Sequence, residues 1–374
     1  MNALRFNRQE WAGAFGDIGT DFPLIVGMIL ASGLDAASVL TMYGIMQVLT
    51  GLLYQRPMPV QPLKAVAMLV IAQKISGPVL YGGGLAIAMV MLALTLTGAL
   101  EWLAGNIPKC VVRGIQAGLG MNLGMLALKD YVARDGLSGY MLAAAAFFMV
   151  LLVWPHRRFP AALAVIGLGL VDAFGFKIHW PDVTAAIGFH HPKFYVPTAK
   201  DILSGFLLLA VPQIPLSIGN SVLATRQVNE DLFPGRPLTV RKIGTTYSLM
   251  NFLCPLLSGV PVCHGSGGMM GHYIFGARTG GSLLIYGGVY LVLGLFFSEG
   301  FTKVMHIFPM PVLGVILFVE ALALITLVRD LSASKSDLWI AFMVAMMAVS
   351  LPNGFVIGCA AGFLVHKFFR KAFL

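Results

Sequence analysis

Long apolar segments, each close to the length of one membrane crossing, follow one another along most of the chain, separated by short stretches rich in charge, Gly and Pro. An α-helix needs about 20 mainly apolar residues to cross the hydrocarbon core of a bilayer. The pattern therefore predicts a series of membrane helices. They are expected at about residues 11–32, 34–54, 82–103, 108–128, 138–154, 160–175, 200–225, 239–257, 281–298, 311–328, 337–350 and 354–369.

Two further apolar segments, at about 62–75 and 263–276, are too short or too rich in Gly to cross a bilayer alone. Each follows a Pro-containing stretch, PMPVQP (57–62) or GVPVCH (259–264). A short element is also expected near 300–308, ahead of the sequence PMP. With the two short segments counted, we expect an all-α polytopic membrane protein of about fourteen transmembrane elements.

These elements divide evenly between two halves of the chain. Residues 1–175 and 200–374 each hold about seven elements, joined by a loop at 176–199. In each half a Pro interrupts the opening helix, in GDIGTDFPLIVG from Gly16 and in VPQIPLSIGN from Val211, and the third element is the short one. An odd number of crossings places the two halves in opposite orientations. The pattern therefore indicates a 7+7 inverted repeat, in which paired interrupted segments mark a transporter's binding site.

The composition supports this picture and excludes others. Of 374 residues, 58% are hydrophobic and 11% charged, with a mean hydropathy of +0.84, whereas soluble domains carry about 25% charged residues. Little chain remains for a soluble regulatory domain. The four Cys show no CxxC pair, so no disulfide framework, metal site or cofactor is expected.

The formal net charge of +9 is interpreted as membrane orientation, not as nucleic-acid binding. With the N-terminus inside, the Lys and Arg residues on the cytoplasmic side outnumber those outside by more than two to one. No signal-peptide pattern opens the chain. We therefore expect a multi-pass protein of the cytoplasmic (inner) membrane with both termini in the cytoplasm.

The two short segments predict an anion site. Three prolines in six residues keep the chain extended to residue 61, so a helix is expected from about Pro62. The second stretch is expected to be extended to about Cys263, with a helix start among residues 264–267. Each helix start exposes up to four unpaired N–H groups and the positive end of a helix dipole. Two such starts facing each other at the midplane would hold an anion.

Side chains next to these starts are the candidate ligands. Glycine leaves the backbone open to close approach at the second start. Lys64 either adds positive charge for an oxyanion or neutralises Asp17, and both interpretations stay open. Amide and hydroxyl side chains at the helix breaks either donate hydrogen bonds to the anion or bond to the backbone groups that each break leaves without a partner. The candidate substrate-binding residues are Asp17, Gln61, Lys64, Gln213, Asn220, His264, Gly265, Ser266 and Gly267.

Ionisable residues within spans are functional candidates because burying them is costly. Asp17 beside an anion is unfavourable unless it is paired or protonated, so we expect Asp17 to carry the proton that accompanies the anion. Glu320 is a second coupling candidate, with a structural hydrogen bond as the alternative. Ser266 and His264 lack the third member of a catalytic triad, so no enzyme is expected.

Four stretches resemble the molybdate transporter family, relatives of the SulP sulfate permeases. They are GAFGDIGTDFPLIVG, PMPVQPLKAVA, PQIPLSIGNSVLAT and VPVCHGSGGMMGHYIFGARTG. The resemblance implies the uracil-permease-like fold, in which a core domain (elements 1–4 and 8–11) moves against a gate domain (elements 5–7 and 12–14). It also implies an oxyanion between the half-helices of the third and tenth elements. Asp21 and Glu320 stand where the family would be expected to have apolar residues, so their roles stay open.

The expected function is secondary-active, proton-coupled import of molybdate by elevator-like movement, with tungstate as an analogue. A homodimer through the gate domain follows by analogy alone. A carrier for sulfate, another oxyanion or a nucleobase is the alternative. A channel is disfavoured because the polar groups cluster at one depth instead of lining a path.

Overall fold

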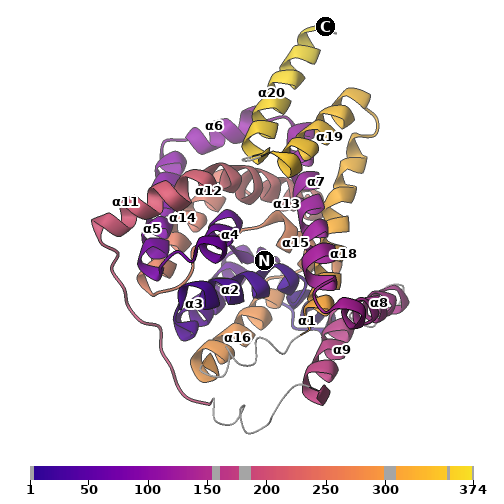
Figure 1. Cartoon of the computed structure of the whole chain (residues 1–374). Helices are drawn as coiled ribbons and strands as arrows, with labels where there is room; N and C mark the ends of the chain where they lie inside the picture. Colours follow the sequence, from indigo (N-terminus) through magenta and orange to yellow (C-terminus); the bar gives the residue numbers. More distant parts are fainter. Residues whose placement is uncertain (1–3, 154–160, 177–186, 299–308, 352–353, 373–374) are drawn as a thin grey trace.

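The computed structural model describes residues 4–153, 161–176, 187–298, 309–351 and 354–372. Within these ranges the protein is helical apart from two three-residue strands and the connecting segments. Among the described residues, five helices are long and apolar enough to cross a membrane, or seven when each of two bent helix pairs is taken as one span. The expected all-helical membrane protein is confirmed at this level (Figure 1).

The elements of the first half correspond to most of the predicted apolar runs. The run expected at 82–103 is two helices, because Gly98 adopts a left-handed φ of 76° between them. The elements are α1 (Arg8–Ala14), α2 (Ile18–Ser32), α3 (Ala36–Tyr54), β1 (Val60–Pro62), α4 (Lys64–Gln73), α5 (Gly77–Leu96), α6 (Ala99–Asn106), α7 (Lys109–Leu126), the π-helical η1 (Ala127–Val132), α8 (Gly136–Val153) and α9 (Ala161–Phe176).

In the second half the run expected at 200–225 is one bent series of short helices. The element expected near 300–308 lies outside the described residues. The elements are α11 (Ala199–Gly205), η2 (Phe206–Ala210), α12 (Val211–Leu216), η3 (Ser217–Ala224), α13 (Thr225–Leu232), α14 (Val240–Leu256), β2 (Val262–His264), α15 (Ser266–Ile274), α16 (Gly281–Phe296), α18 (Met310–Thr326), the 3₁₀-helical η4 (Leu327–Leu331), α19 (Lys335–Ser350) and α20 (Gly354–Ala372).

The first helix is broken before its proline and not at it. Helices α1 and α2 meet at a bend of 41°, while Pro23 lies inside α2. A Cβ added at Gly16, in the break, would stand 2.5 Å from the Gly271 carbonyl of α15. Close backbone packing against α15 therefore coincides with the break, and the expectation that Pro23 interrupts the helix is wrong.

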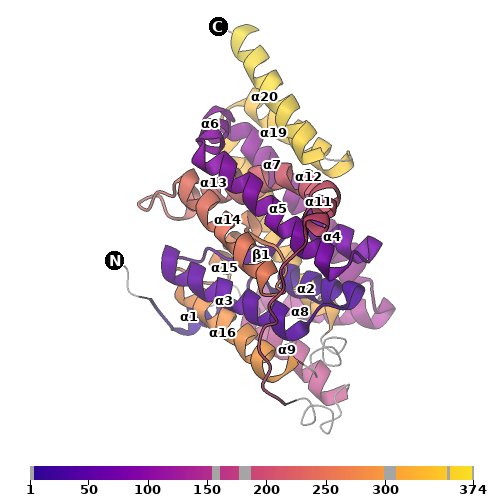
Figure 2. The ribbon, with the colours of Figure 1, turned by 90° about the vertical axis from the view of Figure 1, so that its left-hand side faces the viewer.

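The two strands pair antiparallel, with Gln61 opposite Cys263, at the centre of the molecule. Because this pairing keeps Pro62 in an extended strand, α4 begins at Lys64 and the helix start expected at Pro62 is wrong. The start of α15 at Ser266 lies within the predicted range. Figure 2 shows α4 and α15 on opposite sides of β1, so the pairing brings the starts of the two short helices together.

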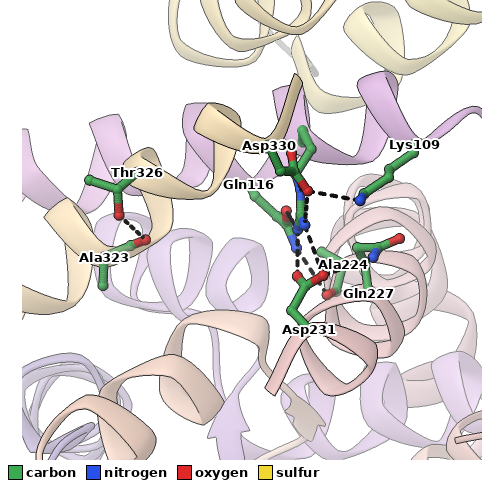
Figure 3. Close-up of polar contacts among 9 residues, drawn as sticks. Lys109, Gln116, Ala224, Gln227, Asp231, Ala323, Thr326 and Asp330 are labelled. Atoms are coloured by element: carbon green, nitrogen blue, oxygen red, sulfur yellow. Dashed lines mark hydrogen bonds and ion pairs between the residues drawn. The ribbon is translucent and has the colours of Figure 1, made fainter. Parts of the chain in front are cut away.

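A buried arginine connects three helical segments at one end of α7. Arg113 forms ion pairs with Asp231 of α13 at 2.7 Å and with Asp330 of η4 at 2.6 Å, although its side chain is only 2% exposed. Lys109 adds a second ion pair to Asp330 at 2.8 Å (Figure 3). Gln116 accepts from the guanidinium and donates to the Ala224 carbonyl. This network joins α7 to the second-half elements η3, α13 and η4.

Candidate functional site

Asp17 and Gln61 form the centre of the candidate site. Asp17 is the N-cap residue of α2, at the break after α1, and it is fully buried. The Gln61 side-chain amide donates to both carboxylate oxygens of Asp17, at 2.8 and 2.7 Å. The other amide atom, Gln61 Oε1, is buried and has no partner within the described part of the chain. The Gln61–Asp17 hydrogen bonds thus join the helix break to the central strand and leave Gln61 Oε1 as a buried acceptor.

Lys64 lies beside this pair, at the first residue of α4. Its ammonium nitrogen is buried and makes no hydrogen bond to any described residue. Its charge acts on three buried carboxylates, those of Asp17, Asp21 and Glu320. One cation therefore faces three acidic groups in a region where burial makes unbalanced charge costly.

The start of α15 packs against these side chains through its glycines. The N-cap residue is Gly265, which has no side chain to cap the helix, and among the described residues no other side chain accepts from its first-turn N–H groups. A Cβ added at Gly265 would stand 1.6 Å from Gln61 Oε1, and one at Gly268 would stand 2.0 Å from Asp17 Oδ2. A Cβ at Gly267 would stand 2.3 Å from Glu320 Oε1. The glycines thus admit polar side chains to a helix start whose dipole favours negative charge.

The start of α4, unlike that of α15, is capped by a side chain from another helix. Gln213 Oε1 accepts from the backbone N–H groups of Ala65 at 3.0 Å and Val66 at 3.3 Å. Its amide nitrogen donates to Ser217, so both ends of the side chain are used. The expectation that both helix starts present unpaired N–H groups is therefore wrong for α4, because an amide from α12 satisfies two of them.

Asn220, Ser266 and His264 lie around the second short helix. Ser266 donates its hydroxyl to Asn220 Oδ1 at 2.8 Å. The His264 ring bonds to Thr246 at 2.9 Å and to the Pro59 carbonyl at 3.3 Å. Ser266 and His264 thus bond to different partners and are not arranged as a nucleophile and its base.

Three residues that the sequence analysis did not single out contact the acidic groups. Tyr43 of α3 donates a short hydrogen bond to Asp21, and the hydroxyl of Tyr286 lies 3.4 Å from the same carboxylate oxygen. Thr20 donates to Glu320 Oε2 at 3.2 Å. A tyrosine within an apolar run is a recognisable signal, because its hydroxyl needs a partner when buried.

Comparison with known proteins identifies the family. The family described as "Molybdate transporter of MFS superfamily" matches residues 9–123 and 205–324, one block in each half. Molybdate transporter 2 of Arabidopsis thaliana is 32% identical over 392 residues, covering 92% of this chain and 83% of that protein. Molybdate transporter 1 of the same plant is also 32% identical, with 97% and 88% covered. The chain belongs to the molybdate transporter family. Its members are transporters and not enzymes.

Solved structures identify the fold. The transmembrane domain of a cyanobacterial bicarbonate transporter, BicA, matches with a TM-score of 0.57 and 16% identity, over 96% of this chain and 99% of that one. Murine solute carrier 26 family member A9, an anion transporter in the inward-facing state, matches with a TM-score of 0.62 and 14% identity, over 98% and 69%. The expected relationship to SulP anion transporters is thereby confirmed at the level of the fold.

Proposed function

We propose that this chain is a secondary-active importer of molybdate, which it binds between the β1–α4 and β2–α15 segments. The antiparallel pairing of Gln61 with Cys263 carries the proposal, since it unites two interrupted segments from opposite halves of the chain. The 32% identity to the Arabidopsis molybdate transporters favours molybdate over sulfate, another oxyanion or a nucleobase.

The 7+7 inverted repeat is part of the proposal. Gln47 of α3 exchanges two hydrogen bonds with the backbone of Val60, at 2.8 and 3.1 Å. Asn251 of α14 does the same with Val262, at 2.6 and 2.9 Å. Matched amide residues thus hold the two central strands, as expected when residues 1–175 and 200–374 repeat one plan.

The anion ligands would be the first-turn N–H groups of α15 and the Lys64 ammonium, while the Gln61 amide nitrogen, already donating to Asp17, would hold that carboxylate in place. At Gly265, Ser266 and Gly267 no side chain of a described residue is hydrogen-bonded to the backbone N–H groups, so they are available to an incoming oxyanion. Gln213, Asn220 and His264 would act mainly by holding the two short helices in place, through the hydrogen bonds described above.

Proton coupling follows from the charge of the site. With all groups ionised, three carboxylates and one ammonium leave a net charge of −2 before a dianion arrives. Protonation of Asp17, which lies against the start of α15, would remove one negative charge and allow proton and anion to enter together. Elevator-like movement of a core (elements 1–4 and 8–11) against a gate (elements 5–7 and 12–14) would complete the cycle.

The proposed setting is the cytoplasmic membrane, with both termini inside and a homodimer formed through the gate.

Uptake of labelled molybdate by cells lacking their own importer tests the function. We expect strong competition by tungstate and weak competition by sulfate. Equal competition would indicate a general oxyanion carrier. Absence of uptake by membrane-inserted, folded protein would overturn the assignment.

A further inference from the structure

Glu320 occupies an unusual position for a carboxylate in the middle of an apolar helix. It lies on α18 and is fully buried. One oxygen, Oε2, accepts from Thr20, while Oε1 is buried without a partner in the part of the chain that the structure describes. That free oxygen stands 2.3 Å from the place that a Cβ on Gly267 would take. The unpartnered oxygen therefore lies at the first turn of α15.

The start of α15 favours negative charge. Within the described part of the chain no side chain accepts from its first-turn N–H groups, and the helix dipole is positive there. A carboxylate oxygen next to such a turn makes the same kind of interaction as an oxyanion. Because Gly267 has no side chain, nothing on α15 itself separates Glu320 from this turn.

We propose that Glu320 is an internal substitute for the substrate anion, which occupies the start of α15 when ionised and gives up that place when protonated. The inference rests on the proposed function and specifies how its proton and anion sites interact. Molybdate and ionised Glu320 would compete for the same N–H groups. Taking up one proton from water removes the negative charge of Glu320, which ends both the competition and the repulsion.

The charged and titratable neighbours of Glu320 favour such a switch. The carboxylates of Asp17 and Asp21 repel an ionised Glu320, and Lys64 attracts it. Tyr131 of η1 lies within electrostatic range of it. Elsewhere on the packed elements, the His272 ring of α15 contacts Tyr286, and the α7 cations are paired with Asp231 and Asp330. Two carboxylates and one ammonium thus surround Glu320, and this excess of negative charge favours uptake of a proton by Glu320 when an anion approaches.

Glu320 and Asp17 would have different roles in the proposed division into domains. Asp17 lies in the first element and so in the moving core, whereas Glu320 lies on α18, the twelfth element, in the gate. Contact between α18 and the start of α15 therefore crosses the boundary between the two. Asp17 would travel with its proton, and Glu320 would control when the anion can bind.

Equilibrium binding of molybdate to the purified full-length chain, measured by calorimetry between pH 5 and pH 8, tests this inference. We expect wild-type affinity to fall with rising pH, by up to about tenfold per pH unit for each linked proton. Glu320→Gln should bind at least about tenfold more tightly than wild type at pH 8, with a shallower pH dependence. The exposed carboxylate of Asp130, on η1, provides the matched control, and Asp130→Asn should follow wild type.

A second variant retains the titrating group. Thr20→Ala removes the hydroxyl that donates to Glu320 and should move the midpoint of the pH dependence to higher pH. A Glu320→Gln protein that keeps the wild-type pH dependence, or a Thr20→Ala protein with an unmoved midpoint, would overturn the inference while molybdate binding still supports the proposed function. Folded wild-type protein that binds neither molybdate nor tungstate at any pH would instead overturn the proposed function, and this inference with it.

Discussion

The Gln61 amide donates to both carboxylate oxygens of Asp17, and this contact joins the break in the first span to the central strand. Asp17→Asn keeps the size of the side chain and removes the charge. If Asp17 carries the coupled proton, Asp17→Asn should lose the stimulation of molybdate uptake at acidic pH and still bind molybdate. Uptake by inverted and right-side-out vesicles at several pH values measures this. An unchanged pH dependence of uptake would exclude Asp17 as the coupling group.

The close packing at the start of α15 predicts that a side chain at Gly268 weakens molybdate binding. A Cβ at Gly268 would stand 2.0 Å from Asp17 Oδ2, so Gly268→Ala must displace the carboxylate. Overpacking of a core commonly costs about 1–3 kcal/mol, and we expect at least a tenfold loss of molybdate affinity.

Gly288 of α16 is the matched control, because nothing stands within 4 Å of its added Cβ. Gly288→Ala should bind as wild type does and unfold at a similar temperature. Equal effects of Gly268→Ala and Gly288→Ala on binding would contradict the site.

Replacement of Lys64 distinguishes the two interpretations of this residue, because its ammonium has no hydrogen-bond partner among the described residues. As an anion ligand, Lys64 contributes a charge-assisted hydrogen bond of about 1.5–3 kcal/mol, so Lys64→Ala should weaken molybdate binding by tenfold or more. Lys64→Arg should recover part of the loss because it restores the charge. Binding that survives Lys64→Ala at full strength would mean that Lys64 only balances the acidic groups.

We predict that the buried Arg113–Asp231 ion pair contributes more to the stability of the protein than an exposed ion pair does. Removing one partner of a buried pair costs about 3–5 kcal/mol. Asp231 is one-fifth exposed, so Asp231→Asn should cost less than this but still lower the unfolding temperature measurably. The exposed Arg226–Glu230 pair is the control, since surface pairs contribute about 0–1 kcal/mol. Equal unfolding temperatures for Asp231→Asn and Glu230→Gln would contradict a stabilising role for the network.

The sequence indicated the broad architecture because membrane helices and proline breaks obey local rules. Prolines fix φ and lack an N–H, so residues 57–61 could be assigned as extended without a structure. Pairing of β1 with β2 could not be predicted, because strands of three residues carry no periodic pattern and Pro62 cannot donate to a ladder. That pairing is the reason why α4 begins at Lys64.

The sequence indicated which residues form the candidate site, but not all of the hydrogen bonds that they make. Asp17, Gln61 and Gly265 lie together because each stands next to a chain break, which the sequence marks. The capping of α4 by Gln213 and the orientation of His264 toward Thr246 depend on side chains brought from distant elements, and no local signal encodes them.

Anomalous diffraction from protein crystals soaked in tungstate tests the central claim most directly, because tungsten marks the position of the oxyanion itself. We predict a tungsten peak within hydrogen-bonding reach of the first-turn N–H groups of α15 and of the Lys64 ammonium. A tungsten peak elsewhere in the membrane domain, with none at the start of α15, would contradict the account.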